Sequence, residues 1–576
     1  MTVSRGARWF ENAVIYAIDV EAFQDSDGDG VGDFEGLTER LDYLDRLGVD
    51  CLWLLPFYDT PNRDNGYDVR DYYAVDSRLG TLGDVVEFLQ AAEERGIRVI
   101  VDLVVNHTST EHPWFQRARE APDSKYRDYY VWTDDPSEAP EWGSVFPGEV
   151  EDDRVWTYDE AADAYYFHRF YPFQPDLDLQ NPDVREEIHK IVDFWLELGV
   201  DGFRIDAATL MIQQKRPGEP EMDDPHAILR ELRANAARTN GEVVLLAEAD
   251  DDPEDLVTYF GGHRLPGSVL EGDGGSSDPD AAAETGEEMD LLLNFVLNAH
   301  LFGALATETA TPLKRCLTDL AEATEAGQWA NFLRNYDELN LGRLPPEDQR
   351  VVFDRFAPDE DMRIYGRGIR RRLAPMLDGD RDRLKQAFSL VFSMPGTPLV
   401  LYGDELGMGE ALDVPGRGAV RTPMQWTDGP NAGFSSASSE SLVAPVVDGA
   451  FGPDRVNAAD QWTDPDSLLR FVQELVGVRK SCPAVGSGRL TLLDTDDPAT
   501  FAHRFDHEGR TVVVVHNLGA DPRTVRLDLP DADGGSLRVL LGDPAIGGDG
   551  SPTVDLDGYG FAWLRVGEDG ASAGPT

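Results

Sequence analysis

The stretch Asp201-Gly-Phe-Arg-Ile-Asp206 combines a short apolar run with a charged pair, Arg204 and Asp206. Such a run is typical of a buried parallel strand that delivers its last side chains to the carboxyl edge of a sheet. Arg204 lies two residues before Asp206, on the same face of the strand, where its charge can keep the carboxylate ionised. An ionised Asp at a strand end suits a nucleophile. The alternative interpretation is a structural ion pair.

Other predicted strand ends also carry polar side chains. Asn106 and His107 end the third apolar run, Glu248 follows the fifth, and Asp337 follows the seventh. Together with Asp206, these ends supply three carboxylates that could point into one pocket. Each buried carboxylate costs several kcal/mol unless it is paired, so a core would not hold three without a use for them.

Two carboxylates about 5 Å apart suit the cleavage of a glycosidic bond with retention of configuration. Asp206 fits the nucleophile that attacks the anomeric carbon of the sugar. Glu248 emerges from the apolar residues 243–247, and an apolar setting raises the pKa of a carboxyl so that it can give a proton to the leaving oxygen. We expect the third carboxylate, Asp337, to hold ring hydroxyls of the distorted sugar.

Eight short apolar runs recur along the chain, most of them separated by helical patterns. They cover residues 13–18, 51–55, 99–105, 202–205, 243–247, 289–293, 330–333 and 398–401. Eight β/α units that close on themselves form a TIM-type barrel. We therefore predict an α/β fold whose (β/α)8 barrel spans residues 1–107 and 176–483.

Two further segments do not follow this rhythm. Residues 108–175, rich in Trp, Tyr, Pro and Asp, are predicted to form an inserted domain after the third strand. From residue 484 to 576, alternating or apolar runs are separated by Gly, Asp and Pro, which predicts a C-terminal antiparallel β-sandwich domain. The acidic, glycine-rich stretch 271–288 is expected to be a solvated loop.

Composition excludes several classes of protein. The chain has 576 residues, 41% of them hydrophobic, which suits a globular protein of several domains. No apolar run reaches the ~18 residues that a membrane helix needs. The first residues have no apolar core typical of a signal peptide, and Cys51, Cys316 and Cys482 are too far apart for a metal motif or a disulfide framework. These features favour the cytoplasm.

The charge balance is strongly acidic. Asp and Glu total 108 against 51 Lys and Arg, for a net charge of −57. Nucleic acids and anionic membranes are therefore poor partners. Only six of the cations are lysines. An acidic, lysine-poor surface suits a protein exposed to molar salt, which screens the self-repulsion, so we predict a halophilic source.

One loop has the pattern of a calcium site. Asp25, Asp27, Asp29, Val31 and Asp33 place oxygens at positions 1, 3, 5, 7 and 9, with glycines between them that allow tight turns. The loop is not an EF-hand, because position 12 is Gly rather than Glu. The alternative is an acidic, glycine-rich turn without a metal.

Four short motifs resemble those of glycoside hydrolase family 13, the α-amylase superfamily. They are Asp102-Leu-Val-Val-Asn-His107, Gly202-Phe-Arg-Ile-Asp206, Leu246-Ala-Glu248 and Phe332-Leu-Arg-Asn-Tyr-Asp337. Within the family the chain resembles the trehalose synthase group, which isomerises maltose and trehalose. That resemblance covers nearly the whole chain and includes Gly368-Ile-Arg-Arg-Arg-Leu-Ala-Pro-Met-Leu and Arg421-Thr-Pro-Met-Gln-Trp.

The resemblance implies roles at the matching positions. Asp206 is implied to be the nucleophile, Glu248 the acid/base and Asp337 the transition-state stabiliser. The implied substrate-binding residues are Asp64, Tyr67, His107, Phe173, Gln174, Arg204, Tyr336 and Arg421. Of these, Asp64 and Arg421 match a pair that closes the pocket around the glucose, which implies an exo mode on short α-glucosides.

The resemblance also implies Ca²⁺ ligands, and the chain departs from the family pattern at two positions. Loops like 25–33 bind Ca²⁺ in the oligo-glucosidase part of the family, and a second Ca²⁺ site would use Asn106 and Asp176, with Gln213 as the third side chain. Tyr336 and Phe173 stand where the family and the trehalose synthases, respectively, tend to have His, which bears on what the glucosyl group is transferred to.

No organic cofactor is implied. Small α-glucosides are the implied partners, and the family leaves room for an oligomer or a maltose kinase partner. Two alternatives to the isomerase stay open at this point. One is a retaining α-glucosidase, in which water resolves the intermediate. The other is a non-catalytic relative used for binding or assembly.

Overall fold

The structure is a computed structural model that describes residues 8–137, 143–216, 218–219, 222–261, 288–320, 327–529, 537–548 and 551–567. At its centre, eight parallel strands close into a barrel in the order β1-β16-β12-β11-β10-β9-β5-β2. These strands are β1 (Ile15–Ile18), β2 (Cys51–Leu54), β5 (Arg98–Leu103), β9 (Gly202–Ile205), β10 (Val244–Ala247), β11 (Leu291–Leu293), β12 (Gln328–Phe332) and β16 (Thr397–Leu401). The predicted (β/α)8 barrel is confirmed.

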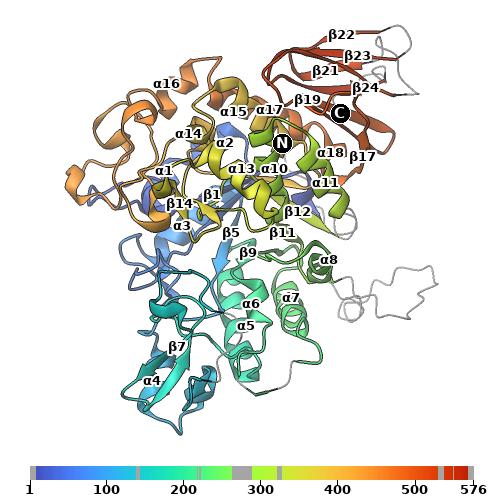
Figure 1. Cartoon of the computed structure of the whole chain (residues 1–576). Helices are drawn as coiled ribbons and strands as arrows, with labels where there is room; N and C mark the ends of the chain where they lie inside the picture. The colour runs from blue at the N-terminus through green and yellow to red at the C-terminus, as the bar shows by residue number, and fades with distance from the viewer. Residues whose placement is uncertain are drawn as a thin grey trace.

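Helices follow the strands and cover the barrel (Figure 1). They are α1 (Phe34–Glu39), α2 (Leu41–Leu47), α3 (Leu82–Glu94), α5 (Pro182–Glu197), α6 (Ala208–Met211), α7 (Ala227–Thr239), α8 (Pro253–Leu256), α10 (Phe295–Thr307), α11 (Thr311–Asp319), α13 (Pro346–Phe356), α14 (Leu373–Met376), α15 (Arg381–Phe392), α16 (Ala458–Thr463), α17 (Leu468–Lys480) and α18 (Pro483–Ser487). Their ends follow local rules. For example, Thr81 and Asp84 form a capping box at the start of α3. Among the described helices, none is both long enough and apolar enough to cross a bilayer.

Strand register places the polar side chains at one rim of the barrel. Asp102 on β5 and Leu246 on β10 both pair with Arg204 on β9. The backbone N–H of Glu248 donates to the carbonyl of Ile205 at 3.0 Å, so the strand ends of β9 and β10 are level. Catalytic residues of TIM barrels lie at this carboxyl rim.

The inserted segment, residues 108–175, contains α4 (Pro113–Glu120) and a small antiparallel sheet. The sheet has the order β6-β8-β7, with β6 (Trp132–Thr133), β8 (Ala164–Phe167) and β7 (Trp156–Asp159). Figure 1 shows it in blue and cyan beyond the barrel rim, at the opposite end of the view from the red C-terminal strands. The backbone of Leu177 donates to the carbonyl of Asn106, so the chain leaves and rejoins the barrel at neighbouring points.

Two antiparallel sheets form the C-terminal part. One has the order β17-β18-β19-β24-β21 and the other β20-β23-β22. Their strands are β17 (Arg489–Leu493), β18 (Thr500–His507), β19 (Arg510–Asn517), β20 (Arg523–Arg526), β21 (Leu537–Gly542), β22 (Ala545–Gly547), β23 (Thr553–Leu556) and β24 (Phe561–Val566). Side chains of both sheets, such as Val513 and Val554, share one buried cluster, as in a β-sandwich. The predicted domain boundary between residues 483 and 484 falls within α18 and stays a prediction. Of the predicted loop 271–288, residues 271–287 lie outside the part of the chain that the structure describes.

Candidate active site

One guanidinium organises the carboxyl ends of β5, β9 and β10. Arg204 Nη1 lies 2.5 Å from Asp102 Oδ1 and 2.6 Å from Asp206 Oδ1, and its Nη2 lies 2.7 Å from Glu248 Oε2. The Arg204 side chain is only 3% exposed. A buried arginine that pairs with three carboxylates offsets the cost of their burial and fixes their orientation.

Burial gives two of these carboxylates different protonation behaviour. Burial raises the pKa of Asp206 to about 6, against the opposing charge of Arg204. Burial raises the pKa of Glu248 to about 7, again opposed by Arg204. Near neutral pH, Asp206 is therefore mostly ionised, whereas a large fraction of Glu248 carries a proton. This difference suits a nucleophile beside a general acid.

The backbone after β9 is strained at the site. Ala207 has φ +48°, the left-handed region that residues with a Cβ seldom adopt, and its N–H donates to Glu248 Oε2 at 2.9 Å. Such strain costs on the order of 1–3 kcal/mol and persists where the surroundings enforce it. Here it helps to position the Glu248 carboxylate next to Asp206.

Asp337 approaches from the loop after β12 and has two arginine partners. Arg417 Nη1 lies 2.5 Å, and Arg421 Nη2 2.9 Å, from Asp337 Oδ1. Burial by itself would raise the pKa of Asp337, but the charges of Arg417 and Arg421 lower it below its ordinary value. Asp337 is therefore ionised across the neutral range, as a stabiliser of positive charge must be.

Arg417 was missed by the sequence analysis. Its Nη2 lies 2.8 Å from Asp64 Oδ1, so one guanidinium bridges Asp64 and Asp337. The expected partner of Asp64 was Arg421, which instead donates to Asn65 Oδ1 at 2.6 Å and to Asp337. Arg417 lies in the 3-10 turn η8 (Gly416–Val420), four residues before Arg421, and this spacing alone does not indicate which carboxylates it bonds.

These groups surround a pocket of about 360 Å³ at the carboxyl rim of the barrel. Its lining includes seven predicted residues and Arg417, together with three phenylalanines: Asp64, Tyr67, His107, Arg204, Asp206, Glu248, Asp337, Arg417, Phe146, Phe170 and Phe295. His107 Nε2 lies 3.0 Å from the Tyr67 carbonyl, which fixes its ring against the pocket. Charged and polar side chains that converge beside aromatic rings suit a small polar ligand such as a sugar.

Comparison with known proteins agrees with this geometry. The α-amylase catalytic domain matches residues 17–338 and 370–488, and a sucrose-hydrolase-like C-terminal domain matches residues 509–565. The chain belongs to the α-amylase family. A trehalose synthase/amylase of Mycolicibacterium smegmatis is 38% identical to it over 98% of this chain and 94% of that protein, and a trehalose synthase of Pimelobacter is 37% identical over 99% and 97%.

Solved structures of α-amylase-family enzymes have the same overall fold. The α-amylase of H. orenii matches with a TM-score of 0.75 at 26% identity, over 96% of this chain and 99% of that chain. A trehalulose synthase matches with a TM-score of 0.74 at 26% identity, over 97% and 100%.

Four predicted substrate-binding residues are not among the described residues that line this pocket: Phe173, Gln174, Tyr336 and Arg421. Gln174 supports the site indirectly, because its Nε2 donates to Asp64 Oδ2 at 3.0 Å. Phe173 stacks on Tyr171 with ring centroids 5.1 Å apart.

Tyr336 is not among the residues that line the pocket, although its family position implied contact with the sugar. Its side chain is hydrogen-bonded to the buried Asp19, and the Arg421 guanidinium lies 3.7 Å from the centre of its ring. Asn335 and Asp337 on either side do line the pocket. Tyr336 therefore supports Arg421, which holds Asp337, and its ring centroid lies 6.5 Å from that of the pocket residue Tyr67.

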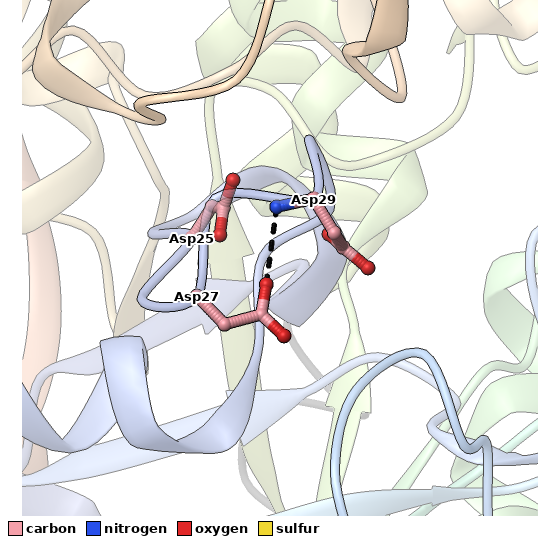
Figure 2. A group of neighbouring side chains, drawn as sticks. All are labelled: Asp25, Asp27 and Asp29. Carbon is pink, nitrogen blue, oxygen red and sulfur yellow. Dashed lines mark hydrogen bonds between the residues drawn. The ribbon is translucent and has the colours of Figure 1, made fainter.

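The predicted calcium loop brings three carboxylates together. Oxygens of Asp25, Asp27 and Asp29 lie within 4.8 Å of one another (Figure 2). Gly30 in this loop has φ +102°, and a Cβ there would lie 2.2 Å from the Ser441 carbonyl, so only glycine fits. Converging carboxylate oxygens are the donor set that Ca²⁺ prefers.

Asp33 is used differently from the other predicted ligands. Its Oδ1 accepts the N–H of Gly36 at 2.6 Å, which caps α1, and its Oδ2 accepts the N–H of Ser26 at 2.8 Å. It is not a member of the group that Asp25, Asp27 and Asp29 form. Val31 belongs to the same loop, and its N–H donates to Asp29 Oδ1 at 2.8 Å.

The second predicted calcium site requires a correction. Lys215 Nζ lies 2.7 Å from Asn106 Oδ1, 2.8 Å from Asp176 Oδ2 and 3.3 Å from the Leu177 carbonyl. Its side chain is 4% exposed. An ammonium therefore occupies the oxygen cage that was predicted to hold a metal, and like charge excludes Ca²⁺ beside it. Lys215, rather than Gln213, supplies the missing member of this site.

Proposed function

We propose that this chain is a retaining α-glucoside transglucosylase that isomerises maltose and trehalose, in the manner of the trehalose synthases. The observation that carries the proposal is the Arg204-linked pair of Asp206 and Glu248, whose pKa values differ, inside a pocket bridged by Arg417. The same chemistry with water as acceptor would make the chain an α-glucosidase. The decisive experiment must therefore show whether glucose or water accepts the glucosyl group.

In the first step, an Asp206 oxygen attacks the anomeric carbon of the glucosyl unit. The bond from that carbon to the glycosidic oxygen breaks, and Glu248 gives its proton to the oxygen, which releases the second glucose within the pocket. Positive charge develops on the ring carbon and oxygen as the bond breaks. Asp337, whose pKa is lowered below its ordinary value by Arg417 and Arg421 despite burial, supports that charge.

In the second step, the released glucose turns and presents its anomeric hydroxyl. Glu248, now a carboxylate, removes the proton of that hydroxyl, the new glycosidic bond forms, and Asp206 leaves as a carboxylate. Two displacements at the same carbon retain the α configuration. Water in place of glucose would complete the same step as hydrolysis, so the pocket must exclude water while the glucosyl-Asp206 intermediate exists.

We also propose a structural Ca²⁺ ion at the loop of Asp25, Asp27 and Asp29. The supporting observation is the convergence of their oxygens together with the bond from Ser435 Oγ to Asp25 Oδ2, which ties the loop to a distant segment. A bound Ca²⁺ would offset two of the three negative charges and strengthen that connection. A cytoplasmic location and a halophilic source remain predictions.

Product analysis from maltose tests the function. Trehalose supports the isomerase, glucose alone identifies an α-glucosidase, and no product identifies a binding relative. Asp206→Ala and Glu248→Gln are each expected to lower kcat by several orders of magnitude.

A matched control comes from the other end of the same strand. Asp201 precedes β9 and accepts the backbone N–H of Val99 at 2.9 Å. Asp201→Asn should therefore keep kcat near the wild-type value while perturbing the same strand. If Asp206→Ala turned over maltose as fast as Asp201→Asn, the assignment of the nucleophile would be rejected.

A further inference from the structure

Two arginines bond the same oxygen of Asp337. Arg417 Nη1 lies 2.5 Å, and Arg421 Nη2 2.9 Å, from Asp337 Oδ1. Within the part of the chain that the structure describes, no hydrogen bond reaches the second oxygen, Oδ2. Because Asp337 lines the pocket, Oδ2 is the oxygen that this carboxylate can offer to a ligand.

The second terminal nitrogen of each arginine is bound elsewhere. Arg417 Nη2 donates to Asp64 Oδ1 at 2.8 Å, and Arg421 Nη1 donates to Asn65 Oδ1 at 2.6 Å. A guanidinium with both terminal nitrogens free can bond both oxygens of one carboxylate in parallel. Here each arginine gives a single nitrogen to Asp337, because its other nitrogen already has an acceptor.

The Asn65 amide is held in the orientation that this contact needs. Asn65 has φ +47°, in the left-handed region that Asn adopts more readily than most residues with a Cβ. Its Nδ2 donates to Glu21 Oε1 at 3.0 Å, so its oxygen is the atom that faces Arg421. The Glu21 side chain is 9% exposed and pairs with Arg78 Nη1 at 3.1 Å. A buried carboxylate therefore determines which end of the amide meets the arginine.

The other contacts of Arg421 do not replace Asn65. Arg421 Nε donates to the Tyr336 carbonyl at 3.2 Å, and the guanidinium lies 3.7 Å from the centre of the Tyr336 ring. Neither contact occupies Nη1, and the Arg421 side chain is only 5% exposed. A buried donor without a partner is costly. Without the Asn65 amide, Nη1 would turn to a carboxylate oxygen such as Asp337 Oδ2.

We propose that Asn65 is a positioning residue, which keeps Asp337 Oδ2 free for the sugar by binding the second nitrogen of Arg421. Asn65 is not among the described residues that line the pocket, and it contributes no reacting atom. It acts on the negative charge that Asp337 presents to a transition state with oxocarbenium character. This inference rests on the proposed function, since that function gives Asp337 its role.

Asn65→Gly tests the inference, because it removes the amide in a backbone conformation that glycine adopts readily. The matched control is Asn62→Gly. Asn62 lies in the same loop with φ +55°, and its Nδ2 donates to Glu21 Oε2 at 3.4 Å. Both variants therefore remove one donor to Glu21, but only Asn65→Gly removes the acceptor of Arg421 Nη1.

Two ligands and one substrate provide the readouts. Isothermal titration calorimetry gives the Kd of 1-deoxynojirimycin in its protonated form, a cationic analogue of glucose, and the Kd of glucose itself. Steady-state kinetics give kcat/KM for maltose. A variant that was merely misfolded around the pocket would bind the cation and the neutral sugar less tightly to the same extent.

We expect Asn65→Gly to weaken binding of the cation by about tenfold, the lower limit for a hydrogen bond to a charged group. Glucose binding should weaken by no more than about twofold, because Oδ2 keeps a lone pair for a hydroxyl even when Arg421 offsets its charge. The kcat/KM for maltose should fall by about tenfold, since the transition state carries positive charge as the cation does. Asn62→Gly should leave all three values unchanged.

Asn65→Asp is a second variant, because Asp also tolerates the left-handed region and keeps an oxygen for Arg421. It should bind the cation at least as tightly as the wild type. The inference would be overturned if Asn65→Asp bound the cation as weakly as Asn65→Gly. Unchanged cation binding in Asn65→Gly, or equal weakening of both ligands, would overturn it too.

Failure of the proposed function gives a different result. A wild type that released only glucose from maltose, or left maltose unchanged, would count against the isomerase. The two ligands would still decide the role of Asn65, since their binding needs no turnover. A wild type that bound the cation no more tightly than glucose would overturn the inference itself.

Discussion

Replacing Lys215 with Met should destabilise the junction of the inserted segment and the barrel. Met keeps much of the apolar stem but removes the ammonium from Asp176 Oδ2, 2.8 Å away, and from Asn106 Oδ1, 2.7 Å away. Breaking a buried ion pair by removing one partner costs about 3–5 kcal/mol, because the other charge stays buried. Asp176 keeps the backbone N–H of Arg169 at 2.9 Å, so we expect a loss near the lower limit, about 3 kcal/mol.

The assay is urea unfolding of wild type and variant in EDTA, which removes any contribution from the loop of Asp25. Lys190→Met is the matched control, since Lys190 is 51% exposed and its pairs with Glu186 and Glu187 lie on the surface. Such surface pairs contribute about 0–1 kcal/mol. A loss for Lys215→Met no larger than that for Lys190→Met would refute the reasoning.

A second arm tests whether the cage is a cation site. Lys215→Ala leaves the Asn106, Asp176 and Leu177 oxygens without the ammonium, which is a donor set suited to Ca²⁺. Ca²⁺ should then restore part of the lost stability, beyond any increase that it gives the wild type. Equal calcium responses in the two proteins would mean that the lysine is not a substitute for a metal.

Four further predictions concern the site and the solvent. A plot of kcat/KM for maltose against pH should be a narrow bell, because Asp206 is protonated below about pH 6 and Glu248 loses its proton above about pH 7. A kcat/KM that is constant from pH 5 to 8 would contradict this. Tyr336→Phe should lower kcat by about tenfold with little change in KM if it acts through Asp337, whereas a rise in KM alone would indicate direct contact with the sugar. Asp27→Asn should abolish the calcium dependence of the wild-type unfolding midpoint, measured by thermal melts with and without chelator. Molar salt should raise the unfolding free energy measured in urea but change kcat by less than about twofold, because the buried site is screened far less than the acidic surface.

The barrel and the central carboxylates could be predicted because strand geometry determines them. Side chains two residues apart share a face, which places Arg204 beside Asp206. Parallel register then brings Asp102 and Glu248 to the same guanidinium. These relations follow from period and register alone, and no loop conformation enters them.

The missed residues depend on how loops and long side chains reach the site. Arg417 belongs to a loop between β16 and the C-terminal helices, and nothing in its spacing indicates that it bridges Asp64 and Asp337. Lys215 follows α6, a helix that ends at Met211, so the direction of its side chain is set by an irregular turn. From the sequence we predicted Gln213 as the third side chain beside Asn106 and Asp176, whereas Lys215 takes this place.

Tyr336 shows a different limit. Its family position implied contact with the sugar, yet residues 335–337 form a bend in which the N–H of Asp337 donates to Asn335 Oδ1 at 3.1 Å. Asn335 and Asp337 line the pocket, and Tyr336 faces Asp19 behind it. The sequence shows that a Tyr replaces the family's His at this position, but the orientation of its side chain depends on the backbone conformation.

The charges of the inner site explain why an acidic protein can use positive groups for catalysis on a neutral sugar. Three arginines, Arg204, Arg417 and Arg421, converge on it. The carboxylates around them are Asp64, Asp102, Asp206, Asp337 and Glu248. With Glu248 protonated, four negative charges face three positive ones, so these side chains carry a net charge of −1. A neutral disaccharide brings no positive charge to balance it, whereas a transition state with oxocarbenium character does. The arginines therefore hold the carboxylates in place without cancelling the charge that favours bond cleavage.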